Sequence, residues 1–333
     1  MTKELWKQLK QNNSFSQTHW PTFTILTFDV LLSLISWRIS FLSAPFFVFS
    51  QLLLCLALFH SYLILHEAAH SAVAQNRSVN DLVGQICGWF LFMPFLSRQS
   101  SHLLHHTWAG HPRRDPANNR MIQKFSVITP KEVKHLEFVW KYWFPAIIIN
   151  DRIGLWRAPF QQSDSGLKSP RVKSEIRWAY LYAAFYFLVG SFILFSGSAQ
   201  HFFLWYLPAL FVCFLVEELA NLPHHAETKL LDDSDKALPY WEQHQVTHSC
   251  KNVPVWSRFV LLNFNMHTAH HLFPTAPWYG LPELQNQIRL ICPDIISEHE
   301  TKNELEWSLL NRRKPLLSIM GHYFYKIAQP RSY

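Results

Sequence analysis

The chain has 333 residues, of which 49% are hydrophobic, 16% aromatic and only 16% charged. This composition is too apolar for an ordinary soluble protein, and it is typical of helices that face lipid with aromatic side chains at the headgroup level. The net charge of +7 comes from lysines and arginines beside hydrophobic segments and not from one compact basic run, so we expect contact with anionic lipid or an acidic protein and no nucleic acid.

The first 20 residues are polar, and the apolar run that follows shows no cleavage site, so we expect no removable signal peptide. Four apolar segments predict transmembrane helices, because each has the length of roughly 20 residues that crosses a bilayer. They are residues 22–42, 45–65, 176–197 and 202–220. Very short connections join each pair, and lysines and arginines flank the other ends, which predicts that the rest of the chain is cytoplasmic.

Two further apolar stretches are too short to cross a bilayer as helices. Residues 82–96 contain Gly84, Gly88 and Pro94 and predict an interfacial or re-entrant helix, and residues 138–149 have a similar character. Residues 161–175 predict a polar loop. The sequence therefore predicts an all-α integral membrane bundle of about four transmembrane helices, with interfacial helices and a cytoplasmic histidine-rich cap. We expect one domain over 1–333, with a polar segment 1–20, a histidine-box region 66–284 and a C-terminal tail 285–333.

The 19 histidines need a chemical explanation, because packing alone does not collect them. HEAAH places His66 and His70 four residues apart, on one face of a continuing helix. HLLHH and HTAHH each combine one histidine with an adjacent pair at helical spacing, so each can serve two metals. They contain His102, His105 and His106, and His267, His270 and His271.

A fourth element, NLPHH, ends the last predicted span with His224 and His225. The spacing from Asn221 favours His225 as a ligand, although either histidine can serve. The predicted topology puts all four clusters on one side of the membrane. Nine imidazoles there are too many for one tetrahedral zinc and suit two metals, but imidazole alone does not identify the metal.

Other functions match parts of this pattern. HEAAH alone fits a membrane zinc peptidase with Glu67 as general base, but that interpretation leaves the two HxxHH boxes unexplained. A metal transporter would carry its ionisable residues along the spans and not at their ends. The five cysteines (Cys55, Cys87, Cys213, Cys250 and Cys292) show no CxxC spacing and predict neither disulfides nor a thiolate metal site.

Over residues 66–284, the order HEAAH, HLLHH, Asn-x-x-x-His, HTAHH resembles the membrane fatty acid desaturases and their carotenoid hydroxylase relatives. Asp115-Pro116 and the HHLFP sequence also look like that superfamily. The resemblance implies two iron ions and dioxygen as co-substrate. It implies as metal ligands His66, His70, His102, His105, His106, His225, His267, His270 and His271.

Metal-bound imidazoles usually donate their other N–H to an oxygen, so we expect acceptors nearby. The candidates are Glu67, Asp115, Glu217, Glu218, Asn221, Asn263 and Asn265. The resemblance implies a fatty acyl desaturase, with carotenoid or other lipid hydroxylation as the alternative. No HPGG motif appears in this chain, so we expect a separate electron carrier such as a ferredoxin or a small cytochrome. Residues 243–248 lie between two ligand elements, and the sequence assigns them no role.

Overall fold

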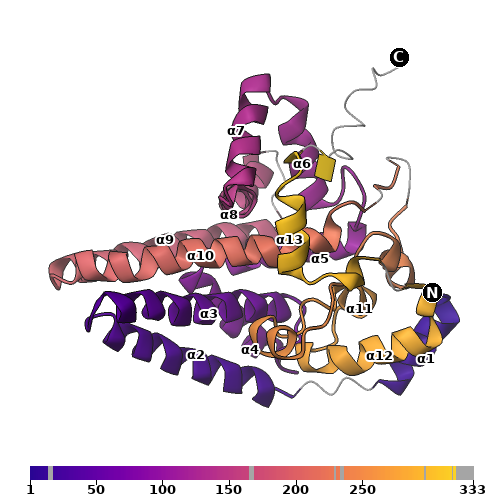
Figure 1. Cartoon of the computed structure of the whole chain (residues 1–333), viewed down its shortest axis with the longest axis horizontal. Coiled ribbons are helices and arrows are strands. Elements are labelled where there is room, and N and C mark those ends of the chain that lie inside the picture. The colour runs from indigo at the N-terminus through magenta and orange to yellow at the C-terminus, as the bar shows by residue number, and fades with distance from the viewer. Residues whose placement is uncertain are drawn as a thin grey trace. The chain divides into compact units, whose positions relative to one another are not determined.

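The computed structural model describes residues 1–13, 18–164, 169–228, 230–232, 236–295, 298–316 and 318–319. Every regular element in these ranges is a helix, which confirms the all-α prediction (Figure 1). The chain forms two compact units. Unit 1 contains Met1–Gln17, Ser101–Ala146 and Glu218–Tyr333, and unit 2 contains Thr18–Ser100 and Ile147–Glu217.

Four helices are long and apolar enough to cross a membrane, which confirms the predicted spans. They are α2 (Trp20–Ile39), α3 (Ala44–Ala69), α9 (Pro170–Phe195) and α10 (Ala199–His225). The first three each carry a proline in the first turn, where its missing N–H costs no helical hydrogen bond. Most of α10 belongs to unit 2, and its last turns, from Glu218, belong to unit 1.

Polar side chains join the apolar helices of unit 2. The buried Ser36 hydroxyl donates to the carbonyl of Ser50 at 2.8 Å and accepts from the indole of Trp205 at 2.8 Å. Asp29 of α2 pairs with His60 of α3, with 2.8 Å between its Oδ1 and the histidine Nδ1. Within an apolar bundle such contacts fix one register of one helix against the next, because any other register leaves a polar group unpaired.

The short apolar stretch 82–96 is the corner between two helices. Helices α4 (Arg77–Phe90) and α5 (Phe95–Trp108) meet at 109°, a geometry that suits either a broken span or a re-entrant loop. Gly88 makes the corner possible, since a Cβ there would lie 2.4 Å from the Met93 carbonyl oxygen and 2.4 Å from the Tyr182 hydroxyl. That hydroxyl donates to the carbonyl of Gln85 at 3.0 Å. The predicted interruption is therefore present, and close packing enforces it.

Two sequence expectations are refined between α5 and α9. The stretch 138–149 is divided between α7 (Pro130–Lys141) and α8 (Ala146–Asp164). The polar loop predicted over 161–175 is shorter, because α8 continues to Asp164 and α9 begins at Pro170 after the N-cap Ser169. The Ser169 hydroxyl accepts from the Val172 amide at 3.2 Å and so caps the N-terminus of α9. Residues 165–168 lie outside the described ranges.

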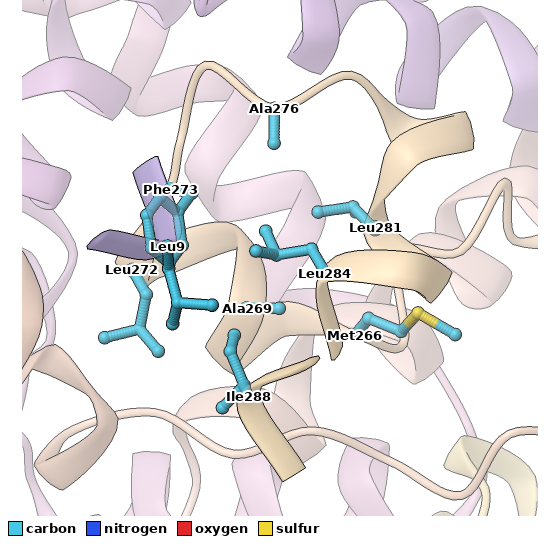
Figure 2. Packing of buried hydrophobic residues seen from close by; sticks show 9 residues of the cluster. All are labelled: Leu9, Met266, Ala269, Leu272, Phe273, Ala276, Leu281, Leu284 and Ile288. Carbon is cyan, nitrogen blue, oxygen red and sulfur yellow. The ribbon is translucent and has the colours of Figure 1, made fainter. Parts of the chain in front are cut away.

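Unit 1 is built from shorter helices around α11 (His267–Leu272). A buried apolar cluster packs against α11, with Leu9 from α1 (Lys3–Asn12) and Leu281, Leu284 and Ile288 from α12 (Leu281–Ile291) (Figure 2). The Trp6 indole donates to the Leu272 carbonyl at 2.7 Å. A histidine-bearing helix of six residues is thus held by tertiary packing, since so short a helix is not stable alone.

The remaining elements of the described chain are α6 (Pro116–Ser126), η1 (Tyr240–Gln245), η2 (Trp256–Val260), η3 (Trp278–Gly280), η4 (Pro293–Ile295), η5 (Glu298–Thr301) and α13 (Glu304–Asn311). Part of the predicted C-terminal tail 285–333 lies outside the described residues, including everything from residue 320 onward.

Candidate metal centre

The box histidines of unit 1 and His225 come from three helices, each of which carries them near an end. The second box occupies the last turns of α5, His225 ends α10, and the third box forms most of α11. The five histidines His102, His106, His267, His270 and His271 are each no more than 4% exposed. Burying so many imidazoles is costly unless their nitrogens are satisfied, and a bound cation is one way to satisfy them.

One group joins the second and third boxes. The Nε2 atoms of His106 and His102 lie 3.2 Å apart, and those of His270 and His106 lie 3.1 Å apart. Two imidazole nitrogens on one metal stand about 2.9 to 3.4 Å apart, as metal–nitrogen distances of about 2.0 to 2.1 Å require. The three nitrogens therefore already have the spacing of ligands to one ion.

A second group lies beside the first. The Nε2 atoms of His225 and His267 are 2.9 Å apart, and those of His271 and His267 are 3.1 Å apart. His105, His225 and His271 also have ligand atoms within 4.8 Å of one another. The ring of His271 stacks on that of His106, with centroids 4.1 Å apart, so the two groups are neighbours. The donor set fits two adjacent metal ions.

Two hydrogen bonds orient histidines of the second group. His105 donates through Nδ1 to Oδ2 of the buried Asp115 at 2.9 Å, and the other oxygen of Asp115 caps α6 by accepting from the Ala117 amide at 3.0 Å. His271 donates through Nδ1 to Oε1 of Gln243 at 2.9 Å. Each contact assigns the proton to Nδ1 and leaves the Nε2 lone pair for a metal.

Electrostatics favour the neutral form of the His271 ring. Burial lowers the pKa of His271 well below its ordinary value, and the neighbouring imidazoles, His106 first, lower it further. A neutral imidazole keeps the lone pair that a metal needs, so no proton has to leave this side chain when a cation binds at neutral pH.

The first box lies in unit 2. His66 and His70 stand at the end of α3, both buried, with ring centroids 5.1 Å apart. The spacing of four thus places both rings on one side of the helix end, as predicted. The buried Glu67 has its Oε1 3.9 Å from His66 Nδ1.

The other predicted oxygen acceptors have varied surroundings. Glu218 pairs with Arg312 at 2.5 Å in unit 1, and Glu217 pairs with Arg152 in unit 2. A buried carboxylate is stabilised by an opposite charge, and the arginines supply it. Asn221 lies half-buried in α10.

The two remaining asparagines donate to backbone carbonyls. Asn263 donates to the carbonyl of Trp278 at 3.0 Å, and Asn265 donates to that of Cys250 at 3.5 Å.

Gln243 is the site residue to which the sequence assigned no role. Its side chain is 1% exposed and, besides accepting from His271, donates to the backbone carbonyl of His106 at 2.6 Å. One amide therefore ties η1 to both the second and third boxes. The available signal was its position between two ligand elements, which does not reveal a partner.

Comparison with known proteins agrees with this site. The family model described as "Fatty acid desaturase" matches residues 42–301. The chain is 24% identical over 311 residues to the chloroplastic omega-3 fatty acid desaturase of Sesamum indicum, covering 86% of this chain and 65% of that one. It is 22% identical over 291 residues to the chloroplastic sn-2 acyl-lipid omega-3 desaturase (ferredoxin) of Arabidopsis thaliana, covering 80% and 62%.

A relative with another activity is also similar. The chain is 24% identical over 230 residues to the zeaxanthin 4-ketolase of Chlamydomonas reinhardtii, covering 68% of this chain and 41% of that protein. The chain spans about two thirds or less of the length of these relatives. Since the family match takes in all three histidine boxes and most of the chain, the chain belongs to the fatty acid desaturase family.

Proposed function

We propose that this chain is an oxygen-dependent di-iron fatty acyl desaturase, which introduces a double bond into the acyl chain of a lipid. The observation that carries the proposal is the pair of adjacent, buried groups of histidines whose Nε2 atoms face one another at 2.9 to 3.2 Å. Family membership and the similarity to omega-3 desaturases support the same chemistry.

The proposed ligands are the seven histidines of the two groups in unit 1 together with His66 and His70 of the first box, which the sequence resemblance assigns to the same metals. Two irons bound there would supply the activation of dioxygen that removal of hydrogen from an unactivated carbon requires. Asp115 and Gln243 hold the imidazoles of His105 and His271 in one orientation, and the burial of these rings keeps bulk water from the reacting groups.

The membrane arrangement is part of the proposal. Four apolar helices support an integral membrane protein, and the distribution of lysine and arginine favours histidine boxes on the cytoplasmic side. The substrate is then a membrane lipid. The electrons come from a separate carrier such as a ferredoxin or a small cytochrome. The similarity to a desaturase whose name specifies ferredoxin supports the first choice, and the exposed Arg113 and Arg114 offer an acidic carrier a basic surface.

Hydroxylation or a related oxidation of a carotenoid or other lipid is the second candidate. The similarity to a zeaxanthin ketolase favours it. Metals held by the same histidine boxes would supply the dioxygen activation that either outcome needs, whether oxygen is added to the carbon or a second hydrogen is removed. The zinc peptidase interpretation of HEAAH receives no support from the family match.

The test is metal analysis and lipid profiling of the detergent-purified protein, with the variants His105→Ala and His270→Ala. We expect about two irons per chain in the wild type and loss of iron in both variants, since each removes a ligand. The exposed His135 provides a matched control, because His135→Ala removes an imidazole outside both groups. New double bonds in the lipids of cells that express the wild type would identify desaturation, and new hydroxyl or keto groups would identify the alternative. Iron content that is unchanged in both ligand variants would refute the proposed site.

A further inference from the structure

A separate cluster of metal-binding side chains lies in unit 1. His224 near the end of α10, Cys250 in the segment before η2, and Glu304 at the start of α13 are 0%, 2% and 1% exposed. One ligand atom from each lies within 4.8 Å of the other two, and His224 Nε2 is 3.9 Å from Glu304 Oε1. A nitrogen, a sulfur and an oxygen donor thus meet in the interior.

These polar groups are poorly satisfied. Among the residues that the structure describes, three atoms of the cluster lack a hydrogen-bond partner: both ring nitrogens of His224 and Oε1 of Glu304. The other oxygen of Glu304 accepts from the Trp256 indole at 3.4 Å, and within the described chain no lysine or arginine pairs with this carboxylate. A buried imidazole and a buried carboxylate oxygen that lack hydrogen-bond partners are costly, and a cation between them would lower both costs.

The backbone holds the three donors in place. The amide of His248 donates to the carbonyl of His224 at 2.8 Å, and the amide of Lys251 donates to the carbonyl of Lys302 at 2.9 Å. The amide of Cys250 itself donates to the carbonyl of Asn265 at 2.9 Å. The three ligand-bearing segments are therefore fastened to one another, directly or through neighbouring residues, before any ion binds.

This cluster differs from the two histidine groups. His224 meets the box histidine His267 by stacking, with centroids 4.5 Å apart and planes 12° apart. Stacking also joins the two histidine groups to each other, through His271 and His106. Within each group, however, the Nε2 atoms face one another, whereas His224 meets His267 through the face of its ring. Cys250 also brings a sulfur, which neither histidine group contains.

We propose that His224, Cys250 and Glu304 bind one zinc ion at a site distinct from the histidine boxes. Zinc accepts nitrogen, sulfur and oxygen donors in a tetrahedral arrangement, and the thiolate selects it over magnesium or calcium. On binding, the sulfur–hydrogen bond of Cys250 breaks and the proton passes to solvent, so one thiolate and one carboxylate balance the charge of Zn²⁺. Ligand atoms around tetrahedral zinc lie about 3.4 to 3.8 Å apart. The three donor atoms, which lie within 4.8 Å of one another, therefore need to move only a short distance toward one another to bind the ion.

A zinc ion at this site would hold two helix ends together beside the second histidine group. It would join the end of α10, which also carries His225, to the start of α13. His224 was a possible ligand from the sequence, but this site was not predicted, because its ligands lie at positions 224, 250 and 304 and form no short motif.

The experiment uses the full chain in detergent, with Cys250→Ser and the matched control Cys292→Ser. Cys292 is a free cysteine outside the cluster. We expect about one zinc per chain in the wild type and the control and almost none in Cys250→Ser, with the iron content equal in all three. After replacement of zinc by Co²⁺, the wild type and the control should show the near-ultraviolet absorption of a cobalt–thiolate bond, and Cys250→Ser should lack it.

A second variant, Glu304→Gln, keeps the shape of the side chain and weakens the site without removing the sulfur. It should lower zinc affinity by at least 10-fold, measured by competition with a chelator, since it replaces a charged ligand with a neutral one. Equal zinc content in the wild type and Cys250→Ser, or no cobalt–thiolate absorption in the wild type, would overturn the proposal. Because the readouts are zinc and a thiolate band, failure here is distinct from failure of the iron site.

Discussion

Gln243 provides a direct test of how the histidine boxes are oriented. In Gln243→Ala, the Nδ1–H of His271 and the carbonyl of His106 lose their partner in a site where the side chain is 1% exposed. Each unsatisfied buried group costs about 1 to 3 kcal/mol, so the variant should lose about 2 to 6 kcal/mol of stability. Loss of the acceptor that orients a ligand histidine should also lower metal affinity by about 10- to 100-fold.

The assay is thermal unfolding in detergent together with metal retention against a graded series of chelator concentrations. Gln245 is the matched control, because it lies on the same short helix η1 and is exposed, so Gln245→Ala should behave as the wild type. Gln243→Glu retains an acceptor for His271 and loses the donor to His106, so it should recover metal affinity more fully than stability. If Gln243→Ala and Gln245→Ala retain metal equally, Gln243 does not orient His271.

Three further changes have defined outcomes. Gly88→Ala forces a Cβ against the Met93 carbonyl and the Tyr182 hydroxyl and should cost about 1 to 3 kcal/mol by thermal unfolding, whereas Gly190→Ala, with no atom within 4 Å of its Cβ, should not destabilise. Arg312→Met removes the buried ion pair with Glu218 and should cost about 3 to 5 kcal/mol, and the exposed Arg313→Met should cost little. Equal melting temperatures would show that the buried pair contributes nothing. Burial lowers the pKa of His244 to about 4, so the unfolded chain binds more protons between pH 6.5 and 4. Stability should therefore fall on acidification through this window, and His244→Gln should flatten that part of the profile.

Most of the fold that could be predicted from the sequence followed from local patterns of apolar residues and histidines. The four spans follow from runs of apolar residues, and the structure extends α3 and α10 through the residues that carry His66, His70 and His225. The spacing of histidines within each box predicted which rings share a helix face, because that depends on helical geometry alone.

Contacts between distant segments could not be predicted in the same way. Glu218 was predicted as an oxygen acceptor near the ligand histidines, and its ion pair with Arg312, 94 residues along the chain, was not predicted. Gln243 meets His106 across 137 residues, and no spacing rule indicates that contact. Cys250 showed no metal-binding motif because the other two members of its cluster come from different segments. Such pairs depend on the tertiary fold and not on the local pattern.

The composition of the histidine groups also bears on electron transfer. Neutral imidazole ligands bring no negative charge to a metal. Asp115, a carboxylate that contacts the second group, accepts from Nδ1 of His105 and so would not bind the metal through that oxygen. Replacing anionic ligands by histidine raises the reduction potential of an iron centre. A redox metal in these groups would therefore be reduced more easily than one in a carboxylate-rich site, and a weakly reducing carrier would suffice to load it with electrons.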